Sequence, residues 1–294
     1  MPKHYILKVL PENLISYNNF QWPSEIGAVV TAPDWKETKE CGNGLHGWLN
    51  GQGGGGACNY FTPTAKWLVL STTTKIINLD GKVKFKTCVI EFIGDQKGAS
   101  DFLAANSTEF SGPVIGKFIA SSSKLEAIGG DYSILSGGDY SSLTGGIYST
   151  LTGGFGSTLT GGFGSLLTGG DSSIFIGYDG STLNGGDSSI FIGYDGSTLN
   201  GGNHSKLTGG NNSTLTGGNH STLTGDDYSI LTGGIYSTLT GGAWSTLIGG
   251  YGTEFRCKYY DDSKYRTAIC VVGETGIKPN VAYQVNHKGK FIKK

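Results

Sequence analysis

A glycine that returns every eight residues dominates the middle of this chain and restricts what it can fold into. Residues 128–255 divide into sixteen consecutive octads without an insertion, and the second position of every octad is glycine. The sixth position is serine in fifteen octads, and the eighth is leucine in thirteen and phenylalanine in three. A fixed period of this kind indicates a repeat architecture, in which each unit packs mainly against its neighbours.

The octad pattern predicts a two-sided β-solenoid. The run S-x-L-T alternates with period two, so serine and leucine are expected to face inward and positions seven and one outward. The fixed glycine indicates a corner, either with a positive φ angle or with close approach of another backbone. A strand this short cannot bury its leucine alone, so two octads should face each other as one 16-residue coil. The segment 171–186 recurs unchanged at 187–202, which supports that unit and predicts about eight coils.

The interior of such a coil follows from the same pattern. Leucines from opposite walls should form the core, and each inward serine needs a hydrogen-bond partner one rung away. Phe175 and Phe191 occupy the same position in successive coils, and we expect their rings to stack.

The flanks of the repeat differ from it in composition. Strands are expected at 5–10, 28–32, 66–71 and 75–92, the last run containing a hairpin at Asp80-Gly81, and a short helix at 100–106. We therefore predict a mainly β protein with four parts. These are an N-terminal α+β or mostly-β domain (1–110), an irregular start of the solenoid (111–127), the octad solenoid (128–255) and a C-terminal β cap (256–294). The cap is expected because open β edges aggregate.

Composition and charge narrow the class of protein. Glycine makes up 51 of 294 residues, but no glycine-every-third pattern occurs, which excludes collagen. The net charge of −1 gives no reason to expect nucleic acid as a partner. The sequence contains no run of about 18 apolar residues, so it predicts no membrane span. The start MPKHYILKVLPEN does not resemble a signal peptide. We expect a cytoplasmic or virion-associated protein.

The five cysteines are odd in number, and none lies within residues 128–255. Together with the expected location, this favours free thiols. A bridge between Cys257 and Cys270 stays open as an alternative.

Two parts of the chain resemble known families. The run STLT at 149–152, 157–160, 213–216, 221–224 and 237–240 is similar to the octapeptide repeat of bacterial ice-nucleation proteins, although Gly-Gly mostly replaces the Gly-Tyr-Gly turn of that family. The segment CGNGLH (41–46) and the tail IKPNVAYQVNHKGKFIKK (277–294) resemble a domain of unknown function found in bacterial, phage and large-virus proteins. These resemblances imply an architecture and no established activity.

Four isoleucines carry the main functional prediction. Ile174, Ile176, Ile190 and Ile192 should form a two-by-two apolar patch on one wall of the solenoid, if the alternation holds. We therefore predict a non-catalytic structural protein whose rod associates with itself as a filament, a fibre or a virion component.

An ice- or water-organising role is the alternative. Outward Thr-x-Thr pairs could present a lattice of hydroxyl groups on either wall, although other residues interrupt both walls. The candidate residues are Thr150, Thr152, Thr158, Thr160, Thr214, Thr216, Thr222, Thr224, Thr238 and Thr240.

Catalytic and metal chemistry have weaker support. Cys41 and His46 are five residues apart and match no zinc spacing or nucleophilic arrangement with a third group. Asp171 and Asp187, like Asp179 and Asp195, should stack one rung apart, where a calcium ion between them is conceivable. We predict no enzyme activity, no cofactor and no bound metal.

Overall fold

The computed structural model describes residues 2–54, 58–107 and 114–294. The chain divides into two compact units, Met1–Ile119 with Ile128–Leu135, and Ala120–Ala127 with Ser136–Lys294. The expected domain boundary at residue 110, and the first residues of the segment 111–127, lie outside the described residues.

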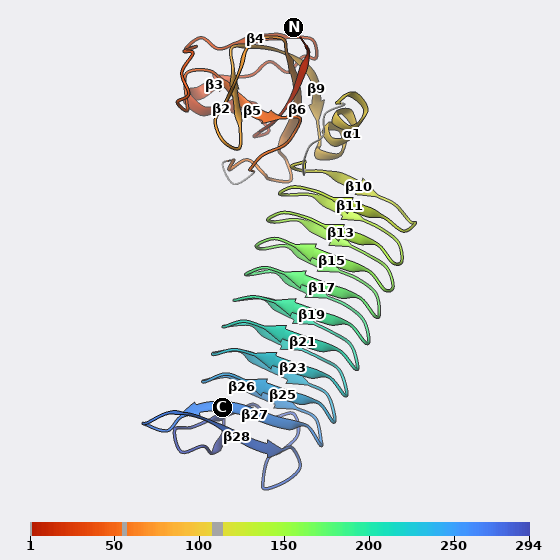
Figure 1. Cartoon of the computed structure of the whole chain (residues 1–294), viewed down its shortest axis with the longest axis vertical. Helices are drawn as coiled ribbons and strands as arrows, with labels where there is room; N and C mark the ends of the chain where they lie inside the picture. Colours follow the sequence, from red (N-terminus) through yellow and green to blue (C-terminus); the bar gives the residue numbers. More distant parts are fainter. Residues whose placement is uncertain (1, 55–57, 108–113) are drawn as a thin grey trace. The chain divides into compact units, whose positions relative to one another are not determined.

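The N-terminal domain is built on one antiparallel sheet (Figure 1) with the strand order β4-β9-β6-β1-β5-β8-β7. Its strands are β1 (His4–Leu10), β4 (Val29–Thr31), β5 (Leu45–Leu49), β6 (Lys66–Thr72), β7 (Ile76–Asn78), β8 (Val83–Phe85) and β9 (Thr87–Gly94). Strands β2 (Ile15–Ser16) and β3 (Phe20–Gln21) pair separately, on either side of a 3-10 turn at Tyr17–Asn19, and the helix α1 spans Gln96–Asn106. Only Lys86 separates β8 from β9, yet the two strands pair toward opposite ends of the sheet, so the sheet must curve.

Two hydrophobic cores cover the two faces of this sheet. Strand β1 contributes to both, because Ile6 and Leu10 lie in one cluster while Leu7 and Val9 lie in the other. The second cluster includes Ala99 and Leu103, the buried residues of α1. The domain is therefore mostly β with one packed helix, as the sequence predicts.

Most of the expected local elements of this domain are confirmed with small shifts of their ends. The single strand expected after the hairpin is instead divided at Lys86 into β8 and β9, and β5 was not expected. The helix starts earlier than expected, because Asp95 caps it by accepting a hydrogen bond from the backbone N–H of Gly98. The hairpin at Asp80-Gly81 joins β7 and β8, with φ angles of 53° and 91° at these two residues. Two consecutive positive φ angles are typical of the tightest β-hairpin turns.

The repeat forms a β-solenoid with two parallel walls (Figure 1). The first wall contains β10 (Phe118–Ala120), β12 (Ile134–Ser136), β14 (Thr150–Thr152), β16 (Leu166–Thr168), β18 (Thr182–Asn184), β20 (Thr198–Asn200), β22 (Thr214–Thr216), β24 (Ile230–Gly233) and β26 (Thr246–Gly249). The second wall contains β11 (Glu126–Ile128), β13 (Ser142–Thr144), β15 (Thr158–Gly161), β17 (Ile174–Gly177), β19 (Ile190–Gly193), β21 (Lys206–Gly209), β23 (Thr222–Gly225), β25 (Thr238–Gly241) and β27 (Glu254–Tyr260).

Residues sixteen apart pair in register along each wall, which confirms the 16-residue coil. Leu159 pairs with Phe175, for example, and Phe175 with Phe191. The eighth-position side chains are at most 1% exposed from Leu135 to Phe255. The rings of Phe175 and Phe191 stack with centroids 4.7 Å apart and planes 5° apart, as expected.

The solenoid has about nine coils rather than eight, because nine strands lie on each wall. The additional coil comes from β10 and β11, in the segment expected to be irregular. Ala127 lies sixteen residues before Leu143 and is buried like it. The segment is thus in register with the octads, but it lacks their glycine and leucine pattern, which concealed it.

The inward serines form hydrogen-bonded ladders, as expected. The backbone N–H of Ser141 donates to Ser157 Oγ over 3.2 Å, and that hydroxyl donates to the carbonyl oxygen of Gly138 over 3.4 Å. Thr253 replaces serine in the last octad without breaking the ladder, because its hydroxyl accepts from Ser237 N–H and donates to Gly234 O. The buried sixth position of the octad therefore requires a hydroxyl group, which either serine or threonine can supply.

The fixed glycine serves close packing and not a positive φ angle. A Cβ atom on Gly209, at the second position of its octad, would lie 2.8 Å from Ser213 Cβ and 2.8 Å from Leu215 Cδ1. The positive φ angles occur instead at the fifth position of all sixteen octads. Eleven of these are residues other than glycine, including Tyr228 at 62° and Trp244 at 58°. The expectation of a positive φ at the fixed glycine was therefore wrong, and that of close approach was right.

The C-terminal segment caps both walls, as predicted. Strand β28 (Tyr265–Val271) pairs antiparallel with β27, and β29 (Tyr283–Val285) pairs antiparallel with β26 and then with β30 (Phe291–Lys293). The ring of Phe255 contacts Tyr283 and Phe291 over the last coil. All five cysteines are free thiols. In the register of β27 and β28, Cys257 lies opposite Ala268 and Cys270 lies opposite Phe255.

Candidate functional site

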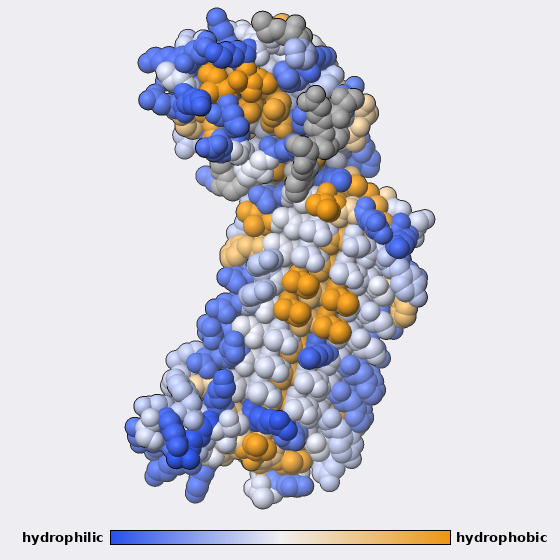
Figure 2. All heavy atoms as spheres, in the orientation of Figure 1, coloured by the Kyte–Doolittle hydropathy of each residue, from blue (hydrophilic) through white to orange (hydrophobic). Residues whose placement is uncertain are grey.

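The four isoleucines lie together on the second wall, on adjacent strands β17 and β19. Ile174 pairs with Ile190 and Ile176 with Ile192 in the parallel register. Ile174, Ile190 and Ile192 are about two-fifths exposed, and Ile176 is half-buried. Figure 2 shows an apolar square midway along the solenoid, with more polar surface around it. We call these four residues the isoleucine patch.

The strands on either side of the isoleucine patch differ from each other. On the N-terminal side, β15 presents Thr158 and Thr160. On the C-terminal side, β21 presents Lys206 next to Ile190 and Thr208 next to Ile192. The patch is thus bordered by two uncharged hydroxyl groups on one side and by a cation on the other.

Most aspartates at the fourth position of an octad accept a hydrogen bond from the backbone of the next coil. Asp171 Oδ1 accepts a hydrogen bond from the N–H of Asp187 over 2.9 Å, and Asp187 Oδ1 accepts from Asn203 N–H over 2.7 Å. Asp195 does the same for Asn211 over 2.8 Å. The fourth-position oxygens of Asn203 and Asn219 accept the same bond, so the contact suits both aspartate and asparagine. The described residues include no group of three or more potential metal ligands.

The threonine pairs proposed for ice binding point outward but do not form a continuous lattice. Thr150 and Thr152 on the first wall are followed by Leu166 at the next rung. On the second wall the isoleucine patch and Lys206 separate the pair on β15 from those on β23 and β25. Thr222 and Thr224 adjoin Thr238 and Thr240, whereas Thr214 and Thr216 lie on the first wall beside Ile230 and Thr232. The structure therefore brings two of the five pairs together and leaves three isolated.

Side chains at the fifth position form exposed stacks along the corners, which sequence reasoning missed. His204 and His220 stack with ring centroids 5.2 Å apart, and Tyr228 and Trp244 stack at 5.1 Å. The ring of Tyr140 covers Gly156, where a Cβ atom would lie 2.8 Å from it. The recurrence of aromatic side chains or glycine at this position was the available signal. These ladders contribute to stability along the rod, as stacked pairs do elsewhere.

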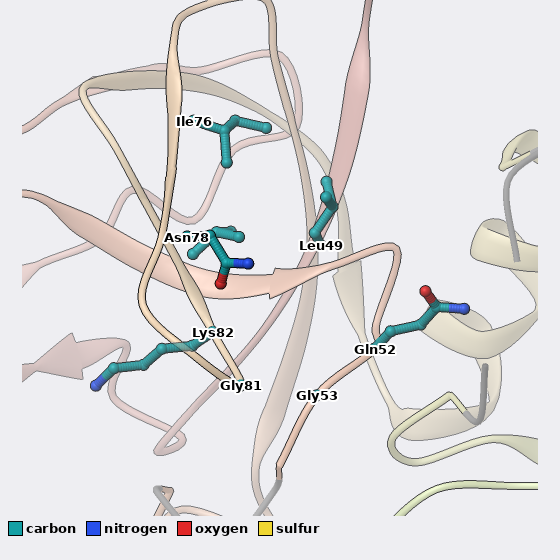
Figure 3. Close-up of a pocket in the computed structure, with 8 residues that line it drawn as sticks. Leu49, Gln52, Gly53, Ile76, Asn78, Gly81 and Lys82 are labelled. Carbon is teal, nitrogen blue, oxygen red and sulfur yellow. The ribbon is translucent and has the colours of Figure 1, made fainter. Parts of the chain in front are cut away.

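The N-terminal domain contains an open pocket of about 380 Å³, lined by Leu49, Gln52, Gly53, Ile76, Asn78, Gly81, Lys82 and Val83. In Figure 3 the polar ends of Gln52 and Lys82 extend away from each other. A binding site for a small molecule usually has polar groups that converge on the ligand. The lining of this pocket does not provide them.

Cys41 and His46 both lie in this domain, and each contacts a different residue. Cys41 is exposed, and its sulfur lies 3.2 Å from Lys82 Nζ. Burial and the charges of Lys8, Lys82 and Lys84 lower the pKa of His46 to about 4. Its Nε2 atom accepts a hydrogen bond from the Gly42 N–H. These contacts hold the segment from Cys41 to His46 in place. Burial raises the pKa of the other two thiols of this domain, Cys58 and Cys88.

Lysines and arginines concentrate in the cap. Residues 256–294 hold nine Lys and Arg against three Asp and Glu, whereas residues 128–255 hold one Lys against nine Asp and Glu. Two of the cap's cations already have partners, since Arg256 pairs with Glu254 and Arg266 with Asp261.

Among the described residues, no helix has both the length and the apolar character needed to cross a bilayer.

Comparison with known proteins concerns the N-terminal domain. No curated protein and no solved structure matches the chain, so the resemblance to ice-nucleation repeats gains no support. The second resemblance, carried by CGNGLH (41–46) and the tail at 277–294, gains no support either. Residues 4–105 match a family described as a domain of unknown function, DUF7666, and a β-solenoid follows this domain in the chain.

Proposed function

We propose that this chain is a non-catalytic structural protein and that its solenoid associates with a second copy of itself through the isoleucine patch. The observation that carries this proposal is the adjacency of four outward isoleucines on paired strands, three of them about two-fifths exposed. Strands favour β-branched residues on exposed faces, and threonine supplies that preference elsewhere on this wall. Isoleucine adds to it an apolar surface that water solvates poorly.

The shape of the wall favours another wall as the partner. Sheets pack face to face about 10 Å apart, with the side chains of both faces interdigitating. A stable interface buries about 800 Å² on each partner, more than four isoleucines supply. Thr158 and Thr160 on β15 and Lys206 and Thr208 on β21 would enlarge it, as the polar rim of an apolar centre.

The distribution of charge supports the same partner. The solenoid's acidic residues sit at the fourth and third positions, at the corners, with Glu254 at the last rung as the exception. Two rods approaching corner to corner would bring these carboxylates together, whereas two walls approaching at the patch would not. Association through the wall is therefore the approach with the least repulsion.

The test compares two double variants that add the same charge to the same wall. Ile176→Lys with Ile192→Lys places two cations in the patch, and Thr224→Lys with Thr240→Lys places two cations on adjacent rungs away from it. Light scattering after size-exclusion chromatography, at about 1–100 μM, covers the affinity range of a small interface. We expect the isoleucine double variant to remain monomeric and the threonine double variant to dimerise like the unmodified chain. Equal association of both variants would overturn the proposal.

A further inference from the structure

The asymmetry around the isoleucine patch determines how two rods would be oriented in the proposed dimer. Resting on the proposed function, we infer that the two solenoids pair with their long axes antiparallel, so that β17 of one copy faces β19 of the other. The determining residue is Lys206, which borders the patch on one side only. On the opposite side, the patch is bordered by Thr158 and Thr160.

Two symmetric arrangements bring one isoleucine patch onto another. Both are related by a two-fold axis that lies in the plane between the walls, as an isologous dimer requires. If the axis runs along the rods, each strand faces the same strand of the partner and the rods are parallel. If the axis runs along the strands, β17 faces β19, β15 faces β21, and the rods are antiparallel.

The parallel arrangement places the two Lys206 side chains at the same rung. Lys206 would face Thr208 of the partner, and the two lysines would be offset along the strands by two residues, or about 7 Å. That separation is within the Debye length of about 8 Å at physiological salt, so salt screens the repulsion between the two lysines only partly. An interface that contains little water screens this repulsion even less. The parallel dimer therefore carries a like-charge repulsion directly beside its apolar centre.

The antiparallel arrangement removes that repulsion. Lys206 would face Thr158 of the partner, whose hydroxyl can accept a hydrogen bond from the ammonium group. The two lysines would lie three strand spacings apart along the rods, about 14 Å. Thr208 would face Thr160 of the partner, so the outer rungs of the interface contain hydroxyl groups and one well-separated pair of cations.

One charge pair favours the parallel arrangement, but it lies far from the patch. In a parallel dimer Glu254 would face Arg256 of the partner. Both side chains are partly exposed and already pair with each other within the chain, and exposed pairs of this kind contribute about 0–1 kcal/mol. Packed sheets cross at about 30°, so the walls diverge before this rung, four strands beyond the patch, whereas Lys206 remains in contact.

Cross-linking of introduced cysteines between two differently tagged copies tests the orientation. A short bis-maleimide is used because sheets packed about 10 Å apart are too far apart for a direct disulfide. Thr160→Cys is mixed with Thr208→Cys in one reaction and with Thr158→Cys in another, with Cys41→Ser in all copies because Cys41 is an exposed thiol. We expect the first mixture to form the mixed cross-linked dimer and the second to form little of it. These variants leave Lys206 and the four isoleucines in place.

The outcomes separate the orientation from the proposed function. Trapping in the second mixture alone would overturn the antiparallel orientation and leave the patch as the interface. Trapping in neither mixture, for a chain that dimerises, would show that the dimer does not use this wall and would overturn both. Lys206→Thr provides the matched control, because it removes the cause of the preference, and both mixtures are then expected to form the cross-linked dimer.

Discussion

The N-terminal domain and the solenoid are both made of β-strands, but their cores are specified over different distances in the sequence. In the solenoid each strand pairs with strands sixteen residues away. In the N-terminal domain β1 pairs with β5 and β6, about forty and sixty residues along the chain. A short sequence repeat specifies the core of the solenoid, whereas contacts between unlike segments far apart in the sequence specify the core of the N-terminal domain. The comparison predicts that the two regions respond separately to mutation.

The largest expected effect is that of a charge in the solenoid core. Leu207 is fully buried, and Leu207→Asp would bury a carboxylate without a partner, at a cost of more than about 4 kcal/mol. Thr208→Asp, one residue later on the outward face, serves as the control and should leave the rod folded.

Tryptophan fluorescence separates the two regions in this experiment, because Trp22, Trp35, Trp48 and Trp67 lie in the N-terminal domain and Trp244 lies in the solenoid. In the Leu207→Asp variant we expect a lost solenoid transition and a retained domain transition during denaturation. Loss of both transitions together would contradict the separation of the two regions.

The next effect distinguishes the two kinds of corner position within the solenoid. Gly209→Ala adds a Cβ atom 2.8 Å from its neighbours, and overpacking of this kind costs about 1–3 kcal/mol. Gly196→Ala meets nothing within 4 Å but retains a φ of 67°, which costs about 1 kcal/mol. Urea denaturation should show the larger loss for Gly209→Ala. The reverse order would mean that backbone conformation, and not space, fixes the second-position glycine.

An intermediate effect concerns the N-terminal domain alone and depends on pH. The pKa of His46 is about 4 in the folded domain against an ordinary value of 6.5. Below pH 6.5 the unfolded state therefore binds a proton that the folded state does not, and stability falls as the pH drops toward 4. Because the side chain is partly exposed, we expect a loss of about 2 kcal/mol or less.

Denaturation followed by the domain tryptophans, at about pH 7 and about pH 4.5, measures this loss. His46→Gln should make the difference between the two pH values smaller, while the solenoid transition should not respond to the substitution. An unchanged pH dependence in the variant would assign it to other groups.

The smallest expected effect is a gain in stability at a fifth-position corner. Ser188 is exposed and has a φ of 58°, a conformation that costs a residue other than glycine about 1–2 kcal/mol. Ser188→Gly should therefore raise stability by about 0.5–1 kcal/mol after the entropy of glycine is subtracted. Ser188→Ala keeps the strain and should give no gain in a thermal melt. A loss of stability in the glycine variant would show that the strain is already relieved.

Much of the solenoid was predictable because its signals are local. Serine and leucine at fixed positions determine which side chains face inward, and the repeated segment 171–202 determines the length of a coil. The extra coil was missed because Ala127 replaces leucine there, so that burial persists while the pattern disappears. The left-handed corners were missed because tyrosine and tryptophan at the fifth position gave no local reason to expect a positive φ.

The candidate site was predictable in its composition but not in its surroundings. Alternation alone places Ile174, Ile176, Ile190 and Ile192 on one face, and the register makes them adjacent. In the N-terminal domain, the curvature of the sheet and the cluster of lysines around His46 depend on which strands pair. No short-range pattern encodes that pairing.

Sedimentation equilibrium of the unmodified full-length chain over a series of concentrations tests the central claim most directly. The account predicts a reversible monomer–dimer equilibrium that Ile176→Lys with Ile192→Lys abolishes. A single species of 30.8 kDa at every concentration would contradict it, because the isoleucine patch would then remain exposed without binding a second copy.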